Sequence, residues 1–328
     1  MSAKSPLTPE QRDSLEATHT FRRIVELRLD PVRGKFDADH LKEINRRIFQ
    51  DLPGLGFDDV VPGEYRPAVP AGNDWIKTRN LETVGAVSHV AYSPMDEAAQ
   101  QRLDRALSQA NPSELAKLKT EQFTKALGQI YTEADYVHPF RDGNSRSLRE
   151  FTRQLAEASG YTLDWERFGR SPHGRDVLYI ARDRSVNALA EPHLQHDSTK
   201  RAVSLTMYQF NANRDLPDLL RDAVRPSRAV MFERESEAEA LRKHPELGEA
   251  FKTLHTASQY FQTKIPDETA RAKALATVRA HVQVKLDEGE TRNFRDDPVT
   301  RNKSQSAIMK NHDRSQERSA DNGPDIER

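Results

Sequence analysis

Apolar side chains recur every three or four residues along most of this chain, a pattern that predicts a mainly α-helical protein. The pattern is most regular over residues 120–137, which predict an amphipathic helix that runs up to His138. A second apolar face follows over residues 148–156 and stops at Gly160, and glycine commonly ends helices in a left-handed turn. The stretch between these two faces is therefore predicted to be a tight loop that joins two helices.

Two further helices are predicted in the N-terminal part, over residues 8–28 and 36–52. The first opens with Thr-Pro-Glu, in which threonine can cap the helix and proline occupies its first position. The periodicity disappears over residues 67–94, where proline, glycine, valine and aromatic residues predict strands and turns. It returns over residues 96–118 and then, mixed with turns, over residues 161–193.

The last third of the chain has a different pattern. Apolar residues alternate over residues 203–207, a stretch too short to distinguish a strand from a helix. Two longer apolar stripes, over residues 247–261 and 270–282, predict two helices that pack as a hairpin, because Pro266 separates them. Few apolar residues follow, and we predict a disordered tail over residues 287–328.

A chain of 328 residues is long enough for two domains. We expect a first domain over residues 1–200, a helical accessory domain over residues 201–286, and the tail beyond them.

Composition narrows the classes of function. A formal net charge of -1 gives no reason to expect nucleic-acid binding. The absence of cysteine excludes disulfides and cysteine-based zinc or redox chemistry. No apolar run approaches the roughly 20 residues of a membrane span, and no apolar segment follows the N-terminus, so we expect a cytoplasmic protein without a membrane partner.

The predicted loop over residues 138–149 carries the residues of a phosphate site. Gly143 and Asn144 can form a turn whose backbone N–H groups, at the start of the next helix, suit a bound phosphate. Arg146 and Arg149 are three residues apart, on one side of the first helical turn, where two guanidinium groups can hold a polyphosphate.

Two further side chains complete this candidate site. Asp142 supplies the hard oxygen ligand that Mg²⁺ prefers beside phosphate oxygens. His138 is a natural acceptor for a hydroxyl proton, because histidine titrates near neutral pH.

The stretch His138–Arg149 resembles the signature of the Fic (Fic/Doc) family, His-x-Phe-x-Asp/Glu-Gly-Asn-Gly-Arg-x-x-Arg. Every specified position matches except the second glycine, which is Ser145 here. If this backbone must take a positive φ, serine costs about 1 kcal/mol relative to glycine. We therefore expect Ser145→Gly to be tolerated or mildly activating.

The resemblance implies a fold: a Fic-type helical bundle with a small β-hairpin flap, which would lie within residues 67–94 and bind the target protein by strand addition. Residues 36–66 also resemble the early part of the family's domain, including its Gly-x-x-Arg turn. Asn45 stands where the family often has histidine, and His40 is interpreted as a helix-start residue and not a ligand.

The resemblance also implies an activity, the transfer of AMP from ATP to a Ser, Thr or Tyr hydroxyl of a target protein. His138 would be the general base and Asp142 the Mg²⁺ ligand. The nucleotide would be bound by the remaining signature residues, which are Gly143, Asn144, Ser145, Arg146 and Arg149.

Two alternatives remain open. A branch of the family transfers another phosphate-containing group, although it tends to lose the Gly-Asn pair and the second arginine, which are present here as Gly143, Asn144 and Arg149. The chain could also be a catalytically weak Fic-fold interaction module, a reading that only Ser145 favours.

Fic proteins are commonly inhibited by a helix with Ser or Thr, three residues, and then Glu followed by Gly or Asn. The sole Glu-Gly or Glu-Asn pair here is Glu288-Gly289, and Val284 stands where the pattern requires Ser or Thr. We therefore expect a separate small antitoxin to supply the inhibitory glutamate to Arg149, with a nonstandard glutamate of this chain as the alternative. The resemblance fits a toxin of the producing cell or an effector translocated into a host cell.

Overall fold

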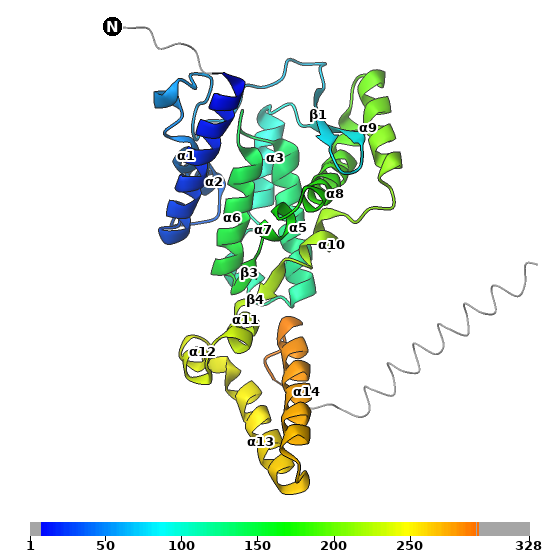
Figure 1. Ribbon diagram of the computed structural model, residues 1–328. Helices are drawn as coiled ribbons and strands as arrows, with labels where there is room; N and C mark the ends of the chain where they lie inside the picture. Colours follow the sequence, from blue (N-terminus) through cyan, green and yellow to red (C-terminus); the bar gives the residue numbers. More distant parts are fainter. Residues whose placement is uncertain (1–7, 293, 295–328) are drawn as a thin grey trace, which may run out of the picture. The chain divides into compact units, whose positions relative to one another are not determined.

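The computed structural model describes residues 8–292 and 294, and most of the predicted tail lies outside them. Contacts divide the chain into two compact units, Met1–Val230 and Met231–Arg328. Helices dominate both units, and the longest strands are the two of one small hairpin (Figure 1). The predicted fold class, mainly α with a β-hairpin, is confirmed.

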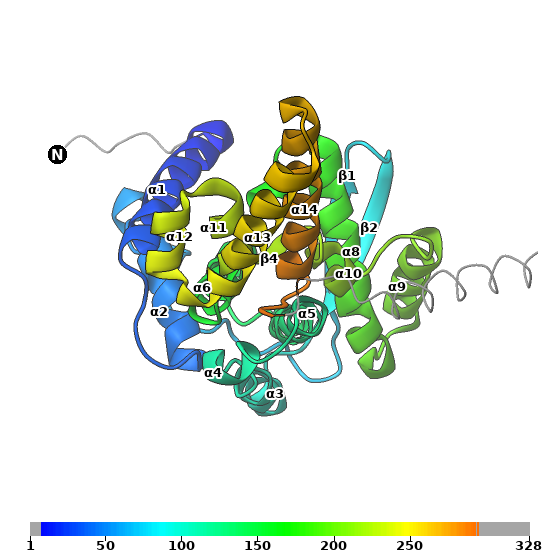
Figure 2. The same ribbon diagram turned by 90° about the horizontal axis from the view of Figure 1, so that it is seen from below.

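The first unit is built around α5 (Thr120–Val137), which contacts α3, α6, α8 and α10 (Figure 2). Its apolar face buries the predicted stripe, with Phe123, Leu127 and Tyr131 fully enclosed. The other helices of this unit are α1 (Pro9–Leu29), α2 (Ala38–Phe49), α3 (Glu97–Leu107), α4 (Pro112–Leu115), α6 (Asn144–Ala158), α7 (Glu166–Gly169), α8 (Pro172–Ala190), α9 (Asp197–Gln209) and α10 (Leu216–Leu220). Short 3-10 turns, η1 (Pro53–Leu55) and η2 (Glu191–His193), complete it.

The predicted helix starts follow from local capping. Thr8 forms a capping box with Gln11 at the start of α1, and the first helical residue is Pro9. Asp37 caps α2 by accepting the backbone N–H of His40. The His40 ring is buried and lies 3.3 Å from the Gln154 amide oxygen, as befits a packed helix-start residue.

The hairpin pairs β1 (Trp75–Leu81) with β2 (Ala86–Tyr92) in antiparallel register, with Trp75 opposite Tyr92. It lies within the region predicted to hold the flap. The far edge of β2 is occupied by side chains of α8 and α9: Asn187 Oδ1 accepts the Ala91 N–H, and Thr206 Oγ1 accepts the His89 N–H. These two N–H groups point away from β1.

The alternation of an antiparallel pair then fixes the orientation of β1. Residues that face Ala91 and His89 form non-hydrogen-bonded pairs, so the N–H and C=O groups of Ile76 and Thr78 point away from β2, and those of Asn80 follow the same alternation. Among the described residues no strand pairs with this outer edge.

The first unit extends beyond the predicted boundary near residue 200. β3 (Tyr161–Leu163) pairs with β4 (Val224–Pro226), and α10 packs against α5 and α8, so residues up to 230 share the first core. The stretch left open between strand and helix is helical: it lies in α9, with Val203 buried and Leu205 exposed.

The second unit is helical. α11 (Ser227–Arg234) crosses the boundary between the units, and α12 (Glu237–Lys243), the 3-10 turn η3 (Pro245–Leu247), α13 (Gly248–Lys264) and α14 (Glu268–Asp287) follow it. α13 and α14 pack against each other as the predicted hairpin. Within the part of the chain that the structure describes, no helix is both long and apolar enough to cross a membrane.

Candidate active site

His138 is the residue at which α5 ends. Its backbone is left-handed, with φ 50° and ψ 59°, and its side chain is buried. The imidazole packs on Tyr92 of the hairpin, with ring centroids 3.9 Å apart. The ring also lies against Trp75, with centroids 5.3 Å apart, so it contacts both strands of the hairpin.

Each ring nitrogen of His138 faces a charged group. The Lys77 ammonium, from β1, lies 3.2 Å from Nε2. An ammonium group can only donate, so Nε2 is the acceptor. Nδ1 therefore carries the proton, and it lies 3.5 Å from Oδ1 of Asp135, one helical turn earlier.

Burial lowers the pKa of His138 to about 4, and the Asp135 carboxylate opposes this shift only in part. The ring is therefore neutral at physiological pH, as a general base must be.

We expect the His138 resonances to keep their neutral positions at pH 5.5 in an NMR titration, with His138→Gln to assign them. Since an unfolded histidine takes up its proton near pH 6.5, folding stability is also expected to fall as the pH drops from about 6.5 towards 4. A midpoint above 6 would contradict this burial argument.

Gly143 starts α6 in the left-handed conformation, with φ 73°. A Cβ built there would lie 1.9 Å from Cζ of the Phe49 ring, so the position excludes every other residue on two grounds. Asn144 closes the loop: its amide donates to the Phe140 carbonyl at 2.6 Å, and its Oδ1 accepts the Phe140 N–H at 2.9 Å. The Asn144 side chain therefore holds the loop, and its backbone N–H is the group left for a ligand.

Gly143→Ala is expected to destabilise the first unit by about 1–3 kcal/mol, through overlap with Phe49 and the unfavourable φ. Urea unfolding measures this loss. Gly169→Ala is the matched control, because a Cβ at Gly169 meets nothing within 4 Å. Equal midpoints for the two variants would contradict the close approach.

The first turn of α6 offers an anion site. Its first internal hydrogen bond is from Ser147 N–H to Gly143 O, so the N–H groups of Asn144, Ser145 and Arg146 have no helical acceptor. Asp142 precedes them with an exposed side chain. No cluster of three or more metal-binding side chains exists among the described residues, so a Mg²⁺ ion would depend on Asp142 together with phosphate oxygens.

The two signature arginines have different surroundings. Arg146 pairs with Glu16 of α1 and donates to Thr20 Oγ1 at 3.1 Å. Arg149 donates to the Ser145 carbonyl at 3.2 Å, and no carboxylate pairs with it in the described part of the chain. Both arginines line a cavity of about 390 Å³ between α1, α6 and α7.

Ser145, the departure from the signature, is an ordinary helical residue of α6. Its φ is not positive, so a glycine at this position would relieve no backbone strain. Its Oγ instead accepts a hydrogen bond of 3.0 Å from Arg182 of α8. The expectation that Ser145→Gly is harmless overlooked this contact, which no local pattern in the sequence indicates.

Two more residues, Asn45 and Arg66, support the loop, and the sequence did not predict their hydrogen bonds to it. Asn45 donates to Ser147 Oγ at 3.0 Å and accepts the N–H of Gly63 at 2.8 Å, so it joins α2 to α6 and to the Gly-x-x-Arg turn. Arg66, which ends that turn, donates to the carbonyls of His138 and Ser93, at 2.8 and 2.7 Å. These bonds tie the end of α5 to the segment that follows β2.

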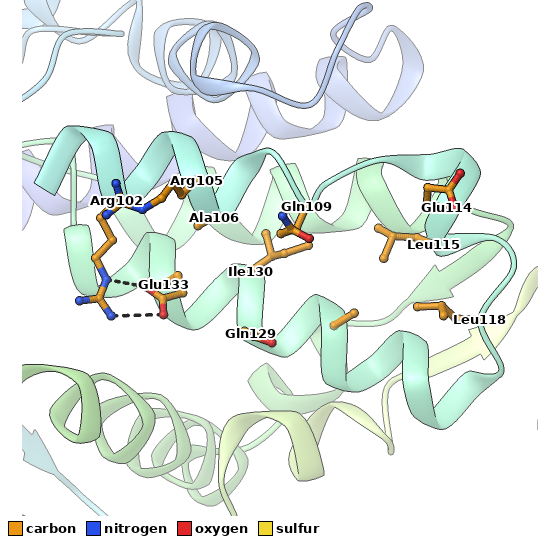
Figure 3. A pocket seen from close by; sticks show the side chains of 11 residues that line it. Arg102, Arg105, Ala106, Gln109, Glu114, Leu115, Leu118, Gln129, Ile130 and Glu133 are labelled. Atoms are coloured by element: carbon orange, nitrogen blue, oxygen red, sulfur yellow. Dashed lines mark hydrogen bonds and ion pairs between the residues drawn. The ribbon is translucent and has the colours of Figure 1, made fainter. Parts of the chain in front are cut away.

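A separate cavity of about 710 Å³ lies between α3, α4 and α5 and contains none of the signature residues. Arg102 and Glu133 pair across one side of it, and Ile130 and Leu115 form part of its wall (Figure 3).

Residues 35–156 match the model of the Fic/DOC family. This part of the chain is therefore similar to the Fic/DOC family domain, and the helical bundle with its small hairpin agrees with that similarity.

The chain is similar to a protein adenylyltransferase of Bartonella schoenbuchensis, VbhT, with 28% identity over 197 residues, which are 59% of this chain and 37% of that protein. It is 26% identical over 147 residues to a protein adenylyltransferase of Bartonella henselae, which covers 44% of this chain and 26% of that one. The chain thus spans little more than a third of the length of the first relative and about a quarter of the length of the second. Among solved structures, the BepC protein of Bartonella tribocorum, a VirB-translocated effector with bound AMPPNP, is 18% identical over 67% of this chain and 89% of that one, with a TM-score of 0.41.

Proposed function

We propose that this protein transfers AMP from ATP to a Ser, Thr or Tyr hydroxyl of a target protein. The observation that carries the proposal is the convergence, within one loop, of a neutral buried histidine, a free helix N-terminus and an exposed carboxylate. The names of the relatives, protein adenylyltransferases, support the same reaction.

In this reaction the target hydroxyl oxygen attacks the α phosphorus of ATP, and its proton passes to Nε2 of His138. The bond from the α phosphorus to the bridging oxygen breaks, and pyrophosphate leaves. The N–H groups at the start of α6 stabilise the phosphate charge, and Arg146 and Arg149 bind the departing phosphates. Mg²⁺, bound by Asp142, would supply further charge neutralisation. Lys77 must release Nε2 before the hydroxyl can reach it.

The outer edge of β1 is the proposed docking edge for the target. The backbone groups of Ile76, Thr78 and Asn80 point outward there, and His138 lies beneath the same hairpin. A target segment that adds as a third strand would present its hydroxyl to Nε2.

Labelled ATP separates the alternatives. Incubation with Mg²⁺ and a candidate target, or with the protein alone, should give protein-bound label from the α phosphate and none from the γ phosphate. Label from the γ phosphate alone would show transfer of a different group. No label from either position, with ATP bound, would favour the interaction module.

We propose further that a separate small antitoxin controls the site by placing a glutamate on Arg149. The support is the open Arg149, the cavity beside it, and an exposed apolar stripe on α1 formed by Phe21, Val25 and Leu29. Phe21 also lines the cavity, so a short amphipathic helix could cover the stripe and reach Arg149. Expression of this chain alone is then expected to arrest growth in a His138-dependent way, in the producing cytoplasm or, for an effector, in a host cell.

The internal alternative has a named candidate, Glu16, because it already pairs with Arg146. If the antitoxin proposal holds, Glu16→Gln changes AMP transfer less than about threefold, since ATP phosphates can displace a partly exposed pair. Asp13→Asn, an exposed change on the same helix, is the control. If the purified protein transfers no AMP by itself and gains this activity with Glu16→Gln, the inhibitory glutamate belongs to this chain and not to an antitoxin.

A further inference from the structure

Behind His138 lies a fully buried ion pair between Asp135 of α5 and Arg182 of α8. Both residues are 1% exposed. Arg182 Nη2 donates to both carboxylate oxygens, at 3.0 and 2.8 Å, and its Nε donates to Oδ2 at 3.1 Å. A buried pair of this kind is seldom more stabilising than an apolar pair of equal volume, so its place beside the proposed base calls for a chemical reason.

Asp135 also faces the ring of His138. Its Oδ1 lies 3.5 Å from Nδ1, a close charge contact and not a formed hydrogen bond, and Nδ1 is buried without a hydrogen-bond partner among the described residues. His138 ends α5 in the left-handed conformation, and Asp135 lies three residues before it in the last turn of that helix. The Asp135 carboxylate is thus the negative charge nearest to Nδ1, and it favours a proton on that nitrogen.

Arg182 connects this pair to the loop that would bind phosphate. Its remaining terminal nitrogen, Nη1, donates to Ser145 Oγ at 3.0 Å. One guanidinium therefore links α5, through Asp135, to the first turn of α6, through Ser145. A glycine at position 145, as in the family signature, would leave Nη1 without this acceptor.

We propose that Asp135 is a positioning residue for His138, and that Arg182 and Ser145 hold its carboxylate in place. The arrangement keeps the proton on Nδ1 and the lone pair on Nε2, and it fixes the base relative to the start of α6. The inference rests on the proposed function only in taking His138 as the base.

The first test measures the tautomer of His138 by ¹⁵N NMR of the ring, without nucleotide or turnover. Lys77 alone would impose the same tautomer, so the comparison is made in Lys77→Met protein, with and without Asp135→Asn. The proton is expected on Nδ1 in Lys77→Met, and the form protonated at Nε2 should rise at least threefold in the double variant. An unchanged tautomer would overturn the proposal.

The second test separates positioning from nucleotide binding. Asp135→Asn is expected to lower kcat by about 10- to 100-fold while the KM for ATP changes less than about twofold. Asp183→Asn is the matched control: Asp183 is equally buried and pairs with Arg79, but it does not contact His138. Equal losses in the two variants, or a loss that falls mainly on KM, would reduce Asp135 to a structural role.

Ser145→Ala covers the case in which Asp135→Asn fails to fold, because it removes one hydroxyl and leaves the ion pair intact. We expect kcat to fall about 3- to 10-fold with the KM for ATP nearly unchanged, and Ser145→Thr to restore part of the rate. Full activity of Ser145→Ala would contradict the role of the Arg182 link. A wild-type protein without any transfer would count against the proposed reaction, whereas the tautomer measurement would still decide the role of Asp135.

Discussion

Replacement of His138 by alanine should lower the rate of AMP transfer by about 10²- to 10⁴-fold, the usual consequence of removing a general base. The imidazole faces Lys77 and Asp135, and within the described residues it makes no hydrogen bond to the N–H groups at the start of α6. ATP binding should therefore stay within about threefold of the wild type. Single-turnover rates and calorimetric titration with ATP measure the two quantities separately.

His89→Ala is the control for this substitution. His89 lies on the same hairpin, but its ring nitrogen contacts Thr78 and not the loop. Its loss should change the rate far less than the loss of His138. If His138→Ala weakened ATP binding as much as transfer, the histidine would hold the nucleotide and would not act as the base.

Arg66→Ala should cost about 3–5 kcal/mol of unfolding free energy. The buried guanidinium donates to the carbonyls of His138, Ser93 and Val137, and it stacks on the Trp75 ring at 3.7 Å. Burial lowers its pKa to about 10, and it still stays charged at neutral pH. Its removal leaves the buried carbonyl of His138 without this donor and removes one of the links between the hairpin and the end of α5.

Denaturant unfolding of Arg66→Ala and Arg22→Ala tests this expectation. Arg22 forms only an exposed pair with Glu26 on α1, so its loss should cost less than about 1 kcal/mol. The two variants lose the same charge and differ in burial. Similar midpoints would mean that the carbonyls behind Arg66 find other donors.

The local part of this architecture could be predicted from the sequence. Helix starts at Thr8 and Asp37 follow from capping residues, and the apolar stripe of residues 120–137 becomes the buried face of α5. The turn at Gly143 was predicted as well, because a turn of this kind depends on a few consecutive residues, here glycine followed by asparagine. The domain boundary was misplaced by 30 residues, since the pairing of β3 with β4 joins segments about 60 residues apart.

The surroundings of His138 were less predictable. Asp135 is one helical turn before it, so the spacing of three residues was a signal that could have been used. Lys77 and Arg182 lie on a hairpin and on α8, about 60 and 40 residues away in sequence, and no spacing rule brings them to the ring. Ser145 was interpreted through backbone conformation alone, whereas its hydroxyl finds a partner that only the packing of α6 against α8 reveals.

The outer edge of β1, which no strand covers in the described part of the chain, has a consequence for the choice of targets if they dock there as proposed. Strand addition there forms its hydrogen bonds through peptide groups, which every sequence has, so these bonds by themselves cannot distinguish one target sequence from another. What it selects is shape: a loop or terminus that can straighten over a few residues fits, whereas a hydroxyl within a helix requires that helix to unwind first. Target proteins should therefore be modified in exposed flexible segments, and a short extended peptide from such a segment should compete with the whole protein.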